Sequence, residues 1–204
     1  MKRRFMTLLV ATAVFAMIGV ATAMAVGVPE IDMANATFQL KAVGTPVVTS
    51  CLGEDATTYK KVTGTWKGGE VDFTPGSTDY SLTGTLGFQS VVWTINTATG
   101  RGVFTATAKL KSSSGIQLYS GPMTLITENN TGAQFAQARG WIVAKTFGGD
   151  PPNPPGSPDG GSLLANVEAS ILQSGSFGIS GTFGDAPPQQ NTPDFSVTTI
   201  NQTC

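Results

Sequence analysis

The sequence predicts an all-β protein: a single antiparallel β-barrel of about ten short strands, preceded by a signal peptide. Apolar and polar residues alternate over many short runs, turn-forming residues separate these runs, and no segment after residue 25 keeps a helical period over three turns. Such short strands and hairpin-length turns favour an antiparallel meander, closed as a barrel or folded as a β-sandwich. Glycines on the apolar faces relieve bending strain in strongly coiled sheets and therefore favour the barrel: Gly84, Gly102, Gly140 and Gly181.

Residues 1–25 have the three parts of a secretion signal. Lys2, Arg3 and Arg4 precede an apolar or small run from Phe5 to Val20, and small residues up to Ala25 fit the cleavage pattern. We expect cleavage after Ala25 and hence a secreted or cell-envelope protein without a stable membrane span. The alternative is that the run stays in the membrane as an anchor, because its length approaches that of a transmembrane helix.

Residues 26–204 suit one domain. Removing three of the 12 basic residues with the signal leaves nine against 13 acidic ones, a net charge of −4. No basic cluster stands out in the sequence, so we expect no nucleic-acid partner. Two cysteines, Cys51 and Cys204, predict a disulfide in an oxidising compartment. The sequence leaves the oligomeric state open.

Strand patterns begin near Thr37 and continue along the chain. After the first strands, the predicted strands are 80–88, 91–95, 102–110, 116–119, 123–127, 135–147, 163–172, 177–183 and 195–200. Turns are expected at 96–100, 112–115, 121–122 and 129–132. Two segments rich in proline, 148–161 and 185–193, are expected to form loops. The segment 163–172 also suits a helix capped by Ser162, although the neighbouring turns favour a strand.

A short motif near the start of the domain adds a resemblance. Thr63-Gly64-Thr65-Trp66-Lys67-Gly68 resembles the Gly-x-Trp signature of lipocalin-like barrels and, more narrowly, the opening motif of nitrobindin-type haem barrels. The resemblance covers these residues alone and implies barrel architecture. The chain departs from the haem barrels at the iron ligand, because those barrels use His and this sequence has none.

The absence of His narrows the chemistry. It removes the usual general base at neutral pH, the Ser–His and Cys–His nucleophile pairs and the commonest transition-metal ligand. We therefore expect no catalytic residue, no cofactor and no metal site. Most carboxylates, including Glu70 and Asp72, fall in turns or at strand ends, where acids usually face solvent. Glu168 lies inside an apolar segment, but the alternation of that segment points it to solvent.

Aromatic residues give the remaining indication of function. They are spread over many strands, so several could line one interior that holds a small hydrophobic ligand, although filled cores use the same residues. The candidate ligand-binding residues are Trp66, Trp93, Trp141, Tyr80, Tyr119 and Glu168. We expect an exported, non-enzymatic barrel that acts as a binding or envelope-surface module, with a small hydrophobic ligand if the barrel is hollow. The alternative is a small barrel enzyme of cyclase or isomerase type that uses a cavity carboxylate or a Tyr.

Overall fold

The computed structural model describes residues 35–53, 56–72, 82–128, 135–148, 157–173, 175 and 177–184, with the backbone alone at 148 and 157–160. All of them belong to one compact unit. The predicted signal peptide 1–25, the loop 185–193, the strand 195–200, Tyr80 and Cys204 lie outside the described residues.

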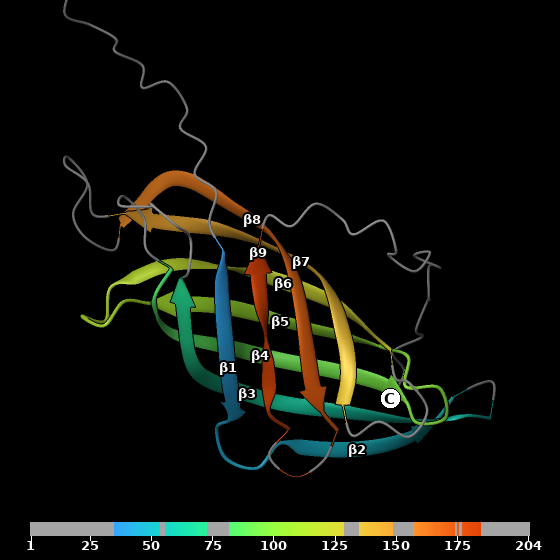
Figure 1. Ribbon diagram of the computed structural model, residues 1–204. Helices are drawn as coiled ribbons and strands as arrows, with labels where there is room; N and C mark the ends of the chain where they lie inside the picture. The colour runs from blue at the N-terminus through green and yellow to red at the C-terminus, as the bar shows by residue number, and fades with distance from the viewer. Residues whose placement is uncertain are drawn as a thin grey trace, which may run out of the picture. The chain divides into compact units, whose positions relative to one another are not determined.

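The described part of the chain is all-β and contains no helix (Figure 1). Its nine strands are β1 (Ala36–Ala42), β2 (Val47–Leu52), β3 (Thr58–Asp72), β4 (Gly84–Asn96), β5 (Gly102–Lys111), β6 (Gln117–Glu128), β7 (Phe135–Gly148), β8 (Ser157–Leu172) and β9 (Ile179–Gly184).

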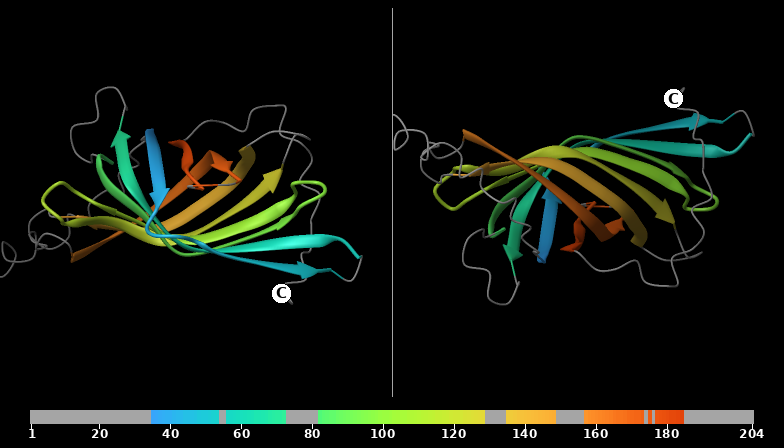
Figure 2. Two further views of the ribbon diagram at one scale, coloured as in Figure 1. Left: turned by 90° about the horizontal axis from the view of Figure 1, so that it is seen from below. Right: turned by 90° about the horizontal axis from the view of Figure 1, so that it is seen from above.

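Eight of these strands close into an antiparallel barrel. The hydrogen-bonded order is β1-β9-β8-β7-β6-β5-β4-β3-β2, and β1 also pairs with β3, which closes the sheet. The second half of β3 pairs with β1, from Trp66 to Asp72, and its first half pairs with β2. The extra strand β2 and the start of β3 therefore extend beyond the barrel (Figure 2). The predicted barrel is confirmed, and the β-sandwich alternative is wrong.

Two predicted strands merge into one, and nine strands replace the expected ten or so. The segments 80–88 and 91–95 were expected to be separate, but β4 runs continuously from Gly84 to Asn96. The pairing register with β5 shifts between Gln89 and Val92, and Ser90 has a positive φ of 51°. The break in the alternation is therefore a β-bulge, which bends a strand without ending it.

The expected turn at 121–122 is also wrong, because β6 passes through both residues. Gly121 faces inward, where a Cβ atom would lie 2.1 Å from the Val143 carbonyl oxygen, so the glycine permits a close approach of β6 and β7. Pro122 is exposed and sits opposite Thr107 in the ladder.

The expected loop 148–161 is shorter than the sequence indicated. β7 includes Gly148, and β8 begins at Ser157, so the last five residues of the expected loop are strand. The ladder resumes after a register shift and pairs Gly148 with Ser157. The segment 163–172 lies wholly in β8, which confirms the strand and excludes the helix.

The hydrophobic core fills the inside of the barrel. Alternation places the inward residues, and β5 is the clearest case, since every second residue from Gly102 to Leu110 is buried. The largest fully buried side chains include Trp66, Trp93, Tyr119, Phe88 and Phe104. Fully burying a large apolar side chain stabilises the fold by about 1.5–3 kcal/mol, so this interior provides much of the stability.

Candidate functional site

A carboxyl group and a phenol meet inside the barrel. Glu70, on β3, is 1% exposed and lies opposite Phe38 on β1 and Gly84 on β4. Tyr119, on β6, is also 1% exposed. Its hydroxyl donates a hydrogen bond of 2.7 Å to Glu70 Oε2. The closed sheet thus brings together two residues that are 49 positions apart in the chain.

Strand alternation directs both side chains inward. On β3, Glu70 follows the buried Trp66 at an even spacing, so the two residues lie on the same face. On β6, Tyr119 shares the inward face with Met123 and Leu125, both of which are buried. The local sequence of each strand therefore fixes the direction of each side chain, and barrel closure fixes the distance between them.

The second oxygen of Glu70 is the unusual feature of the site. Oε1 is buried and has no hydrogen-bond partner among the described residues. Leaving a buried polar atom unpaired costs about 1–3 kcal/mol, and more for a charged group. Native proteins rarely keep such an atom, and those that do typically use it to hold a ligand or an ordered water, or in their chemistry.

The environment of Glu70 favours the neutral acid. Burial is the largest influence and raises the pKa of Glu70 from its ordinary value of 4.5 to about 8; the hydrogen bond from Tyr119 lowers this pKa, and the negative charge of Asp72 raises it. At neutral pH the carboxyl group is therefore mostly protonated. A neutral carboxylic acid can both accept and donate a hydrogen bond.

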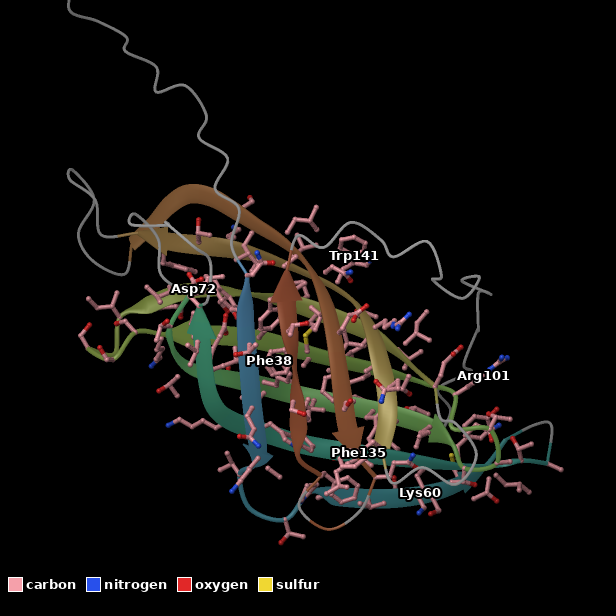
Figure 3. The ribbon with its side chains drawn as sticks, in the orientation of Figure 1. Phe38, Lys60, Asp72, Arg101, Phe135 and Trp141 are labelled. Carbon is pink, nitrogen blue, oxygen red and sulfur yellow. The ribbon has the colours of Figure 1, made fainter. Side chains whose placement is uncertain are left out.

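Asp72 lies at the end of β3, and Figure 3 labels it there. Its Oδ2 accepts a hydrogen bond of 3.0 Å from the Leu82 backbone N–H, and its own N–H donates to Thr83 Oγ1 at 3.1 Å. These bonds tie the end of β3 to the residues that lead into β4. They fix the Asp72 carboxylate close to Glu70.

Aromatic rings surround the acid and the tyrosine. Phe183 lies 6.3 Å from the Tyr119 ring and 4.7 Å from the Phe38 ring, measured between centroids. Phe38 in turn lies 5.6 Å from Phe88, which lies 6.2 Å from Phe104. Glu70 thus places one polar group in an aromatic interior built by β1, β4, β5, β6 and β9.

The two buried tryptophans use their polar atoms within the protein. The Trp66 indole N–H donates to the Phe177 carbonyl oxygen at 2.6 Å, and the Trp93 indole N–H donates to Thr127 Oγ1 at 3.1 Å. With both N–H groups engaged, these rings offer only apolar surface to anything else in the interior.

The structure separates the predicted site residues into two groups. Trp66, Trp93 and Tyr119 are buried inside the barrel. Trp141 lies on the outer face of β7 and is 50% exposed (Figure 3), so the expectation that it lines the interior is wrong. Its inward neighbours are Gly140 and Ile142, and alternation therefore turns Trp141 outward.

Glu168 also lies outside the barrel. Its side chain is 50% exposed and its Oε1 lies 3.6 Å from Arg139 Nε, across the β7–β8 ladder. The prediction that Glu168 faces solvent is confirmed, so it does not serve as an interior ligand-binding residue. An exposed ion pair of this kind contributes little, typically below about 1 kcal/mol.

Glu70 is the site residue that sequence reasoning missed. Its place near a strand end predicted that it faces solvent, and the structure shows it buried. The signal that could have found it is the even spacing from Trp66 through Glu70, which continues the apolar face of β3. Position near the end of a strand does not imply exposure when a closed barrel surrounds that end.

Comparisons of the chain with known protein families, with curated proteins and with solved structures give no match. Within the described ranges, no group of three or more Cys, Asp or Glu side chains is placed to hold a metal ion. The same part of the chain contains no helix of the length and hydrophobicity needed to cross a membrane.

Proposed function

We propose that the protein is an exported, non-enzymatic β-barrel that binds a small hydrophobic ligand in its interior. The observation that carries the proposal is the unpaired Oε1 of Glu70 among aromatic rings. Small-molecule sites typically combine apolar and aromatic walls with a few polar groups that fix orientation. Barrels of eight strands have interiors that either fill with side chains or hold one small ligand.

A carboxyl group at this position is costly for a protein that needs only a core. Burying a polar group without full hydrogen bonding is unfavourable, and an apolar side chain at residue 70 would avoid that cost. The hydrogen bond from Tyr119 satisfies only one of the two carboxyl oxygens. A ligand that bonds Oε1 would satisfy the second.

The exported location rests on the predicted signal peptide and on the cysteines. Cys51 lies in β2, the strand that extends beyond the barrel, and is half-buried. A disulfide to Cys204 would tie the end of the chain to β2 and would suit an oxidising compartment.

The proposal can be tested by adding toluene to the ¹⁵N-labelled protein and following the three tryptophan indole N–H signals by NMR. We expect the signals of the buried Trp66 and Trp93 to shift in a saturable way. The exposed Trp141 is an internal control and should stay unchanged. Unchanged Trp66 and Trp93 signals, together with an unchanged melting temperature, would contradict an interior ligand site.

An enzymatic function is the second candidate, and the raised pKa of Glu70 favours it. An acid that is protonated near neutral pH beside a tyrosine hydroxyl can donate a proton to a bound substrate and take it back, as isomerases require. The variant Glu70→Gln separates the two functions. It should preserve binding in a binding module, whereas it would abolish turnover in an enzyme because an amide cannot transfer the proton.

A further inference from the structure

The hydrogen bond from Tyr119 assigns different roles to the two oxygens of Glu70. Because Oε2 accepts the Tyr119 proton, it acts as the acceptor of the carboxyl group. The carbonyl oxygen of a neutral acid is its better acceptor, so the acidic proton belongs on Oε1. Oε1 is the buried atom without a partner among the described residues. The acid therefore presents a free O–H donor inside the barrel.

Few charges oppose or assist that donor. The inward residues beside Glu70 on β1, β4 and β9 are apolar: Phe38, Leu40, Leu86, Phe88 and Phe183. The titratable groups that face it in the described structure are Tyr119 from β6 and Asp72 from its own strand. A ligand carboxylate would meet the negative charge of Asp72. A ligand ammonium would find aromatic walls that cannot accept its remaining protons, and burying both ions costs several kcal/mol per ion.

We propose that Glu70 selects the ligand: the interior binds neutral, hydrophobic molecules that carry an acceptor oxygen, such as a ketone or an ester, and Glu70 Oε1–H donates to that oxygen. This inference rests on the proposed function, because it requires an interior that admits a ligand. It adds the chemical class of the ligand and the residue that recognises it.

Cyclohexanone and methylenecyclohexane form a matched pair of probes, because they share ring size and shape and differ in the acceptor oxygen. Their affinities can be measured from the shifts of the Trp66 and Trp93 indole signals. We expect cyclohexanone to bind about tenfold more tightly, the gain of one hydrogen bond to a buried donor that otherwise stays unpaired. Equal affinities would contradict the inference.

Two variants test the role of Glu70 without relying on one change. Glu70→Gln keeps a donor for the ligand and an acceptor for Tyr119, so it should retain the preference for the ketone. Glu70→Leu removes the donor and should bind both probes equally. A ketone preference that survives Glu70→Leu would overturn the assignment, even if the variant is less stable than the natural protein.

The pH profile distinguishes a proton donor from a residue that only shapes the interior. Since the pKa of Glu70 is about 8, the natural protein should lose its ketone preference as the pH rises past that value. Glu70→Gln has no proton to lose and should keep a constant preference over the same range. Parallel profiles for the two proteins would contradict the inference.

The outcomes separate the two proposals. If neither probe moves the buried indole signals, the interior admits no ligand and the proposed function fails. If both probes bind equally in the natural protein, the binding function stands and the selection by Glu70 fails. Tighter binding of cyclohexylammonium than of cyclohexanone would overturn the neutral ligand class.

Discussion

At the scale of single residues, Glu70 controls how stability depends on pH. The folded protein keeps the Glu70 proton up to a pH of about 8, whereas the unfolded chain releases it near 4.5. Unfolding between these values therefore releases a proton. The stability that comes from the buried neutral acid is complete below 4.5 and is lost as the pH rises to about 8.

We predict that the free energy of unfolding of the natural protein falls relative to Glu70→Gln between pH 4.5 and 8. The difference should change by about 1.4 kcal/mol per pH unit at most, and it should level off above pH 8. Urea denaturation followed by tryptophan fluorescence at several pH values measures it. A constant difference between the two proteins would show that Glu70 titrates normally.

A second prediction concerns the buried bond between Trp93 and Thr127. Thr127→Val preserves the shape of the side chain but leaves the Trp93 indole N–H without its acceptor. We expect a loss of about 1–3 kcal/mol in the free energy of unfolding. Thr124→Val is the matched control, because Thr124 is exposed on the same strand, and it should change stability by less than about 0.5 kcal/mol. Similar losses in both variants would refute the role of the bond.

At the scale of elements, glycines let neighbouring strands approach closely at the inward face. A Cβ atom on Gly140 would lie 2.0 Å from the Thr124 carbonyl oxygen, and one on Gly84 would lie 2.1 Å from the Lys111 carbonyl oxygen. Backbone atoms cannot move aside without disturbing the ladder. These glycines therefore permit the strong coiling of the barrel, as their position on the apolar faces predicted.

Gly140→Ala should lower the free energy of unfolding by about 1–3 kcal/mol through overpacking. Gly69→Ala provides the control, because a Cβ atom at Gly69 on β3 meets nothing within 4 Å. Thermal or urea denaturation compares the two variants. If Gly140→Ala is as stable as Gly69→Ala, the close approach at residue 140 does not limit the fold.

Strand patterns in the sequence predicted most elements but not their continuity. Alternation identified β5, β7 and β8, because each is a long run with one buried face. It divided β4 at Ser90 and β6 at Gly121, since a bulge and a glycine–proline pair look like turns in a single sequence. Whether such residues bend a strand or end it depends on the neighbouring strand.

At the scale of the whole molecule, barrel closure creates the candidate site. The buried direction of Tyr119 follows from the pattern of its own strand. Its bond to Glu70 requires the strand order and the pairing of β1 with β3, which no local pattern determines. Sequence reasoning therefore found the aromatic interior and Tyr119, and it missed the acid that the interior encloses.

The proposed link between the chain end and β2 also acts on the whole molecule. We predict that the protein, recovered from an extracytoplasmic compartment and denatured without reductant, has no thiol that can be titrated. A disulfide that closes the segment from Cys51 to Cys204 can stabilise by up to about 5 kcal/mol, because it restricts the unfolded chain. Two reactive thiols would refute the disulfide.

The central claim is that the barrel interior holds a neutral ligand against Glu70. The most direct measurement is the set of intermolecular nuclear Overhauser effects between cyclohexanone and the ¹³C-labelled protein. The account predicts contacts from the ligand to ring protons of Tyr119 and Phe38, which lie beside Glu70 inside the barrel. Contacts confined to exposed residues such as Trp141 and Leu164 would contradict it.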